Sequence, residues 1–257
     1  MHSTLTIAAA HERYLTRSPV GHRSLHEIFH WSQCVALLNQ KLSHQPIRLE
    51  DKDPIWAAAA SFSVISFSSA DALKPEDAWP LKRPEPSDLV WLRLSEGKKV
   101  IWDLVQPLRS GSVFYSMSVE YAKLFPPISP VRSDNISPQL ERVCNLDPSS
   151  TLENNPYFGA AHALSRLEGH PREDLTPSQC FIFTRHMERP FKKLLDKKDP
   201  IALLLMALWY RTSGPVVWWI EQRATVERQA ICLYIQRHHG NASDILDLLP
   251  WENSAEA

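Results

Sequence analysis

The stretch that decides the fold is DPIALLLMALWYRTSGPVVWWIEQRATVERQAICLYIQR, residues 199–237. It opens with Asp199-Pro200, a carboxylate that can cap a helix, followed by a proline at the first helical position, where its missing N–H is not needed. An uncharged run over 201–210 follows, and the segment TSGP at 212–215 marks a turn. Two adjacent tryptophans then lead into an amphipathic segment that ends at residue 237. We therefore expect two helices joined by a short turn, a buried hairpin at the centre of the fold.

Helix-like spacing extends through the rest of the chain. Apolar residues recur at three- and four-residue intervals, and no segment shows a convincing strand alternation. Glycine is scarce, with 7 residues, while proline is common, with 20. This composition disfavours the tight turns of all-β folds and suits helices separated by proline-marked loops. The sequence therefore predicts an all-α fold, an irregular multi-helix bundle around the buried hairpin, in a single domain over residues 1–257.

Capping signals place several helix starts. Asp53-Pro54 repeats the cap-and-proline pair of the hairpin and is expected to start a helix at residue 55. Thr176 and Gln179 have the spacing of a capping box, which would open a helix over 180–195. The predicted helices outside the hairpin cover residues 3–14, 25–42, 55–70, 89–106, 112–124, 137–145, 157–167, 180–195 and 241–249.

Charge and cysteine content exclude several classes of partner. The formal net charge is −1, so no strong field would draw the whole chain to nucleic acid. The 4 cysteines are dispersed without a CxxC pair, which fits buried thiols better than a disulfide framework. The longest uncharged stretch, residues 54–70, is short and serine-rich for a bilayer span. We expect no membrane span.

Histidine spacing provides the sharpest candidate for a metal site. His22, His26, His30 and Cys34 recur every four residues and would form one stripe on a helix. Two neighbours of the stripe could share a zinc or copper ion, but the whole set spreads over about 18 Å, too far to enclose one ion. A histidine-rich, partly exposed helix face explains the pattern as well. We therefore expect no metal site and no cofactor.

Three common enzyme motifs do not occur in the sequence. It contains no G-x-S-x-G nucleophile motif, no phosphate-binding G-x-x-x-x-G-K-[ST] loop and no G-x-G-x-x-G fingerprint. A glycine-rich loop that binds phosphate is not expected in a chain with 7 glycines. We therefore expect no catalytic residue, and a protein that is not an enzyme.

The aromatic residues of the hairpin are the best candidates for a binding site. Clefts between helices often hold apolar ligands, with a few polar groups that orient them. A tryptophan-rich core without any ligand is the alternative interpretation of each aromatic residue taken singly. The hypothesis of a pocket for a hydrophobic small molecule names Met206, Trp209, Tyr210, Trp218, Trp219 and Gln222 as its lining.

An ordered set of segments gives the chain a family resemblance. The segments are MHSTLTIAAAHERY (1–14), FHW (29–31), residues 53–70 ending in SFSSA, PEDAWP (75–80), DLVWLRLSEGK (88–98), RPF (189–191), LLLMALWY (203–210), VWWIEQRA (217–224) and AICLYI (230–235). Together they resemble the C-terminal regulatory region of fungal transcription factors of the binuclear zinc-cluster type, in the branch like the sterol uptake control protein. The similarity runs in the same order over nearly the whole chain, and 75–80 with 88–98 is its most specific part.

The resemblance implies an all-helical effector domain that regulates transcription. It implies a nuclear location with shuttling to the cytoplasm, a sterol-like hydrophobic ligand, contacts with transcription machinery or with a DNA-binding partner protein, and a homodimer. The family's cluster of six cysteines that binds two zinc ions is missing here, so direct DNA binding is not expected of this chain. The alternative is a stand-alone helical scaffold for protein–protein interaction in a metabolic gene cluster, without ligand or DNA binding.

Overall fold

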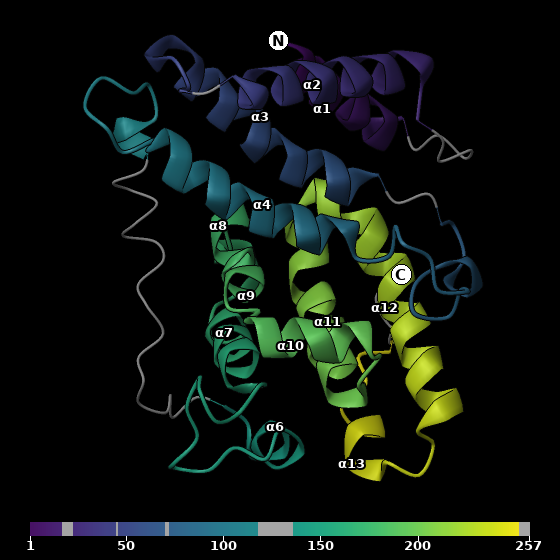
Figure 1. Cartoon of the computed structure of the whole chain (residues 1–257). Coiled ribbons are helices and arrows are strands. Elements are labelled where there is room, and N and C mark those ends of the chain that lie inside the picture. Colours follow the sequence, from purple (N-terminus) through teal and green to yellow (C-terminus); the bar gives the residue numbers. More distant parts are fainter. Residues whose placement is uncertain (17–22, 45, 70–71, 118–135, 252–257) are drawn as a thin grey trace. The chain divides into compact units, whose positions relative to one another are not determined.

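The computed structural model describes residues 1–16, 23–44, 46–69, 72–117 and 136–251 (Figure 1). About 68% of these residues are helical, and no strand occurs among them. The prediction of an all-α, multi-helix fold is therefore confirmed. None of the helices in these ranges combines the length and the hydropathy that a membrane span requires.

The chain divides into two compact units, each built from two separate stretches of sequence. The first unit holds residues 1–71 and 86–124, and the second holds residues 72–85 and 125–257. The expected single domain stays a prediction, because two compact units can unfold either together or separately.

In the described residues, the first unit contains the helices α1 (His2–Leu15), α2 (Leu25–Ser43), α3 (Leu49–Ser68) and α4 (Val90–Val105). Helix α1 packs on α2 and α3, and α3 packs on α4. Arg13 of α1 donates from Nε and Nη2 to the buried carboxylate of Glu27 on α2, at 3.0 and 2.9 Å. Its Nη2 also donates to the backbone oxygen of Ser68 at 2.9 Å, so one side chain links three helices.

Asp53 does not cap α3, contrary to the sequence prediction. The helix begins at Leu49, and Pro54 lies inside its second turn. The Asp53 carboxylate instead accepts hydrogen bonds from the Ser112 hydroxyl at 2.9 Å and the Val113 N–H at 3.0 Å, and it pairs with Arg109. Burial pushes the pKa of Asp53 upward, but these donors outweigh it, so the pKa lies below its usual range. The carboxylate therefore ties the segment after α4 to α3. The predicted helix over 112–124 lies mostly outside the described residues.

Short helices surround the hairpin in the second unit. The segment predicted as one helix over 180–195 is divided into α8 (Pro177–Cys180), α9 (Ile182–Arg185) and α10 (Arg189–Asp196). The capping box of Thr176 and Gln179 is confirmed. Pro190 explains the second break, because its ring would clash with a carbonyl one turn earlier in a continuous helix. The remaining elements are η1 (Pro75–Asp77), α6 (Pro138–Val143), α7 (Phe158–Glu168), η2 (Arg172–Asp174), α11 (Pro200–Ser213), η3 (Gly214–Val216), α12 (Trp218–His238) and α13 (Ser243–Leu246).

The predicted hairpin is formed by α11 and α12, joined through η3. Helix α11 is buried from Ala202 to Tyr210 and packs on α7, α8, α10, α12 and α13. Helix α12 buries a stripe whose members recur at three- and four-residue spacing, as expected for a helix that packs through one face. The members of this stripe are Ile220, Ala224, Glu227, Ile231 and Ile235.

Candidate functional site

Asp199 positions the start of α11, as its sequence context predicts. Its Oδ1 accepts from the backbone N–H groups of Ile201 at 3.1 Å and Ala202 at 3.0 Å. The same oxygen accepts from the Tyr157 hydroxyl at 3.1 Å, which joins the cap to the segment before α7. Burial and the negative charge of Asp199 raise the pKa of Tyr157 above its ordinary value. Asp199 thus links the first turn of the hairpin to the Tyr157 hydroxyl, which keeps its proton.

Three of the six predicted pocket residues lie inside the protein core. Met206, Trp209 and Tyr210 are at most 1% exposed. The Trp209 indole N–H donates to the backbone oxygen of Cys180 at 2.8 Å, and its ring stacks on Phe183 with centroids 5.3 Å apart. The aromatic face and the polar atom of Trp209 are thus both engaged by other helices of the second unit.

Tyr210 belongs to a buried polar network between α11 and α12. Its hydroxyl donates to Oε2 of Glu227 at 2.6 Å, and Arg223 pairs with Oε1 of the same carboxylate. Burial, followed by the charge of Glu227, raises the pKa of Tyr210 well above its ordinary value, so the hydroxyl keeps its proton. The spacing of Arg223 and Glu227 is the usual i,i+4 helical pair, a signal that could have identified them from the sequence. No local sequence pattern indicates that Tyr210 contacts Glu227, which lies 17 residues further along the chain.

The other three predicted residues, Trp218, Trp219 and Gln222, are half-buried at the start of α12. The two tryptophan rings meet edge to face, with centroids 5.5 Å apart and an interplanar angle of 87°. The Trp219 ring also stacks on Phe181, with centroids 6.3 Å apart. The Trp219 indole N–H is buried and has no hydrogen-bond partner within the ranges that the structure covers. The six residues therefore divide into a core group with protein partners and a partly exposed group with an unused donor.

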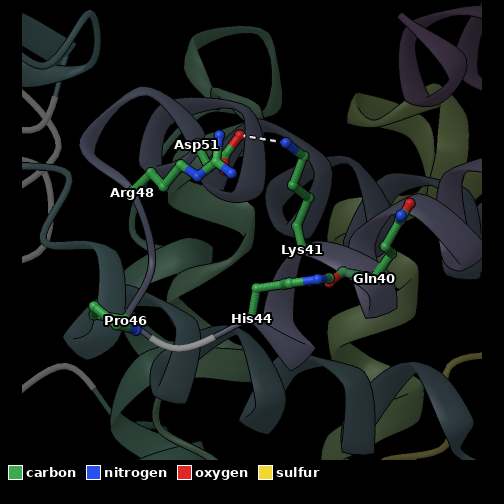
Figure 2. Close-up of a pocket in the computed structure, with 6 residues that line it drawn as sticks. All are labelled: Gln40, Lys41, His44, Pro46, Arg48 and Asp51. Carbon is green, nitrogen blue, oxygen red and sulfur yellow. Dashed lines mark hydrogen bonds and ion pairs between the residues drawn. The ribbon is translucent and has the colours of Figure 1, made fainter.

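A surface hollow of about 250 Å³ lies in the first unit, at the turn between α2 and α3 (Figure 2). Lys41 reaches across it to Asp51, with Nζ and Oδ1 2.6 Å apart, and His44 Nδ1 lies 2.6 Å from the backbone oxygen of Gln40. Five of its six lining residues are polar or charged, so the hollow does not match the predicted site for a hydrophobic ligand. Its lining residues are Gln40, Lys41, His44, Pro46, Arg48 and Asp51.

The predicted histidine stripe does not act as one group. His22 lies outside the described residues, and His26 is exposed. His30 turns to His2 of α1, with the two Nδ1 atoms 2.9 Å apart, and Cys34 is buried beside Ser3. Burial raises the pKa of the Cys34 thiol, so it keeps its proton at neutral pH. Among the described residues no group of three or more histidine, cysteine or acidic side chains is arranged to hold a metal ion.

The histidine stripe also contains an enzyme motif, which its four-residue spacing alone does not reveal. Residues 26–30, HEIFH, match H-E-x-x-H, in which two histidines bind zinc and the glutamate serves as general base. Here Glu27 is fully buried, and both of its carboxylate oxygens accept from Arg13. A carboxylate that is buried and ion-paired in this way is not accessible to a metal-bound water. The match therefore does not build a zinc hydrolase site in this arrangement.

A comparison of the chain with protein-family models, with curated proteins and with solved structures finds no match. The resemblance to the zinc-cluster regulators therefore stays a prediction.

Proposed function

We propose that the chain is a helical effector domain that regulates transcription through contacts with other proteins, in a regulator of the fungal zinc-cluster type. The observation that carries the proposal is the ordered set of matching segments, which runs from residues 1–14 to residues 230–235. The all-α fold is the fold class that this resemblance implies. The missing cysteine cluster means that DNA contact would come from a separate reader module or protein.

A reporter experiment tests this proposal directly. The chain is fused to an unrelated DNA-binding module in a fungal cell that carries a reporter gene with the matching sites. We expect reporter output to differ severalfold from that of the module alone, and the fusion to accumulate in the nucleus. An inert helical protein of similar length, fused in the same way, is the control. Reporter output equal to this control, with the fusion soluble and nuclear, would contradict the proposal.

The finer part of the proposal is a hydrophobic ligand with one oxygen acceptor, such as a sterol. The observation that favours it is the buried Trp219 N–H, which has no partner in the described residues, beside the half-buried Trp218 and Gln222. A sterol hydroxyl could accept this hydrogen bond while its rings contact the indoles. The ligand would change partner contacts only if it binds one conformation of the domain better than another.

Matched tryptophan variants test the ligand. A fluorescent sterol is titrated into the pure chain, and energy transfer from tryptophan is measured. Trp219→Phe keeps an aromatic ring and removes the N–H, so we expect about two- to tenfold weaker binding, the range of one hydrogen bond. Trp251→Phe changes an exposed tryptophan and should bind like the unchanged chain. Absence of saturable binding would remove the ligand and leave the protein–protein scaffold as the function of the hairpin. Equal affinities in the two variants would contradict a hydrogen bond from Trp219 to the ligand.

A further inference from the structure

We propose that His2 and His30 form a two-histidine site for a late first-row transition-metal ion, zinc or copper(II), that clamps α1 to α2. The inference is independent of the proposed role in transcription. It rests on the convergence of two ring nitrogens from different helices, with Nδ1 atoms 2.9 Å apart and ring centroids 5.1 Å apart. The sequence spacing placed His30 in a stripe with other residues of α2, whereas in the structure its ring contacts His2 of α1.

The protonation chemistry of the pair suits a metal ion. A hydrogen bond between two Nδ1 atoms requires one ring to carry its proton there and the other to present a lone pair. When the first ring moves that proton to Nε2, both Nδ1 lone pairs point into the same space, and each neutral imidazole becomes a ligand. No proton has to leave the pair when both rings start neutral. The metal ion thus takes the position between the two Nδ1 atoms that the proton of the hydrogen bond occupies in its absence.

The geometry needs only a small opening. Zinc–nitrogen bonds of about 2.0–2.1 Å in a tetrahedral arrangement place the two nitrogens roughly 3.4 Å apart, about half an ångström more than here. Both rings are half-buried, so the remaining coordination positions can be filled by water. Phe29 packs against both rings, with centroids 6.3 Å from His2 and 5.2 Å from His30, and limits their rotation. Within the described residues neither histidine is engaged by a carboxylate that would compete for it.

Neighbouring groups are excluded as ligands by their own contacts. Glu27 is held by Arg13, and the Cys34 side chain is buried beside Ser3. The site therefore has two protein ligands, which predicts a reversible, moderate affinity rather than the tight binding of a closed four-ligand site.

The test is a titration of the untagged chain with zinc ions and, separately, copper(II) ions, by calorimetry at pH 7.5. We expect the affinity for the tightest-bound metal equivalent to fall about tenfold or more in His2→Gln and in His30→Gln, since each variant loses one of the two ligands. The control His170→Gln changes an exposed histidine of the second unit and should leave that equivalent unchanged. Zinc should also raise the melting temperature of the unchanged chain and of the control, but not of the two variants.

Two results would overturn the site. One is an affinity in His2→Gln or His30→Gln equal to that of His170→Gln, which would place the ion elsewhere. The other is a loss in His26→Gln together with retention in His2→Gln, which would place the ion on the i,i+4 pair of α2. Glutamine preserves much of the size and polarity of histidine, and melting without metal identifies any variant that fails to fold.

Discussion

At the scale of single residues, Glu227 is a buried carboxylate with contacts from both helices of the hairpin. Its side chain is 10% exposed, and that of its partner Arg223 is 12% exposed. Tyr210 supplies the second contact from the opposite helix through a hydrogen bond of 2.6 Å. A carboxylate in such a place is tolerated because both of its oxygens have donors, and removing a donor leaves an unsatisfied buried acceptor.

We expect Tyr210→Phe to lower the free energy of unfolding by about 1–3 kcal/mol, because Glu227 loses one donor in a buried place. Glu227→Ala should cost more, about 3–5 kcal/mol, since Tyr210 and Arg223 both lose the buried carboxylate that they contact. Urea unfolding measures both. Tyr234→Phe, a half-buried tyrosine of α12, is the matched control and should change stability by less than about 0.5 kcal/mol. Equal effects of Tyr210→Phe and Tyr234→Phe would show that the hydrogen bond contributes nothing.

His186 is the residue with the clearest link to pH. Burial, together with the positive charges of Arg185 and Arg166, lowers its pKa from 6.5 to about 4. The ring is therefore neutral in the folded protein at pH values where the unfolded chain already binds a proton. Stability contributed by the neutral ring is complete above about pH 6.5 and is lost as pH falls toward 4.

We expect the melting temperature of the chain to fall between pH 6.5 and 4, and the fall to be smaller in His186→Gln, which cannot take up a proton. His170→Gln, at an exposed histidine, should keep the slope of the unchanged chain. Melting curves at half-unit pH steps measure the slopes. The assignment fails if His186→Gln and His170→Gln have the same slope over this window.

At the scale of elements, two glycines differ in the space that an added Cβ atom would have. Gly214 stands where α11 turns into η3, and a Cβ built there would lie 2.8 Å from the Cβ of Ala224 on α12. Gly97 lies inside α4, and a Cβ there would meet nothing within 4 Å. The first glycine therefore permits the close approach of the hairpin helices, while the second only weakens its helix.

We expect Gly214→Ala to destabilise the protein by about 1–3 kcal/mol, the usual cost of overpacking. Gly97→Ala should stabilise it by about 0.5–1 kcal/mol, because alanine restricts the unfolded chain and favours the helix. The same substitution at two sites thus predicts opposite shifts in thermal unfolding. Shifts of the same sign would contradict the close contact at Gly214.

At the scale of the whole molecule, the two compact units alternate along the chain. Residues 72–85 of the second unit stand between the two stretches of the first. Trp79 and Pro80 in this segment are buried, and Lys198 donates to the backbone oxygen of Pro80 at 2.6 Å. Neither unit is a continuous piece of sequence, which favours the prediction of a single cooperative domain.

We therefore expect one calorimetric unfolding transition, and we expect substitutions in either unit to lower its temperature. Glu27→Gln removes the charge that Arg13 faces in the first unit, and Glu227→Gln removes the one that Arg223 faces in the second. Both variants should shift the same transition. Two transitions, each moved by only one of the variants, would instead establish two domains.

The sequence by itself determined the parts of the fold whose partners are close in the chain. Asp199 caps α11, and Thr176 with Gln179 forms the predicted capping box, because donor and acceptor lie within three residues of each other. The all-α class follows from spacing and from scarce glycine for the same local reason. The helix predicted over 180–195 was wrong at Pro190, although the break has a local cause, since proline in a helix interior removes a hydrogen bond and clashes with the previous turn.

Only the tertiary structure decided which distant groups meet. Asp53 carries the local signal of a cap, yet its carboxylate binds Ser112 and Val113, because charge-assisted bonds across the fold outweigh a cap within an already formed helix. Trp209 was predicted to line a pocket, whereas its ring stacks on Phe183 and its N–H donates to the backbone oxygen of Cys180. His30 likewise meets His2. Such pairings join residues far apart in sequence, so their formation depends on helix packing, which no local pattern specifies.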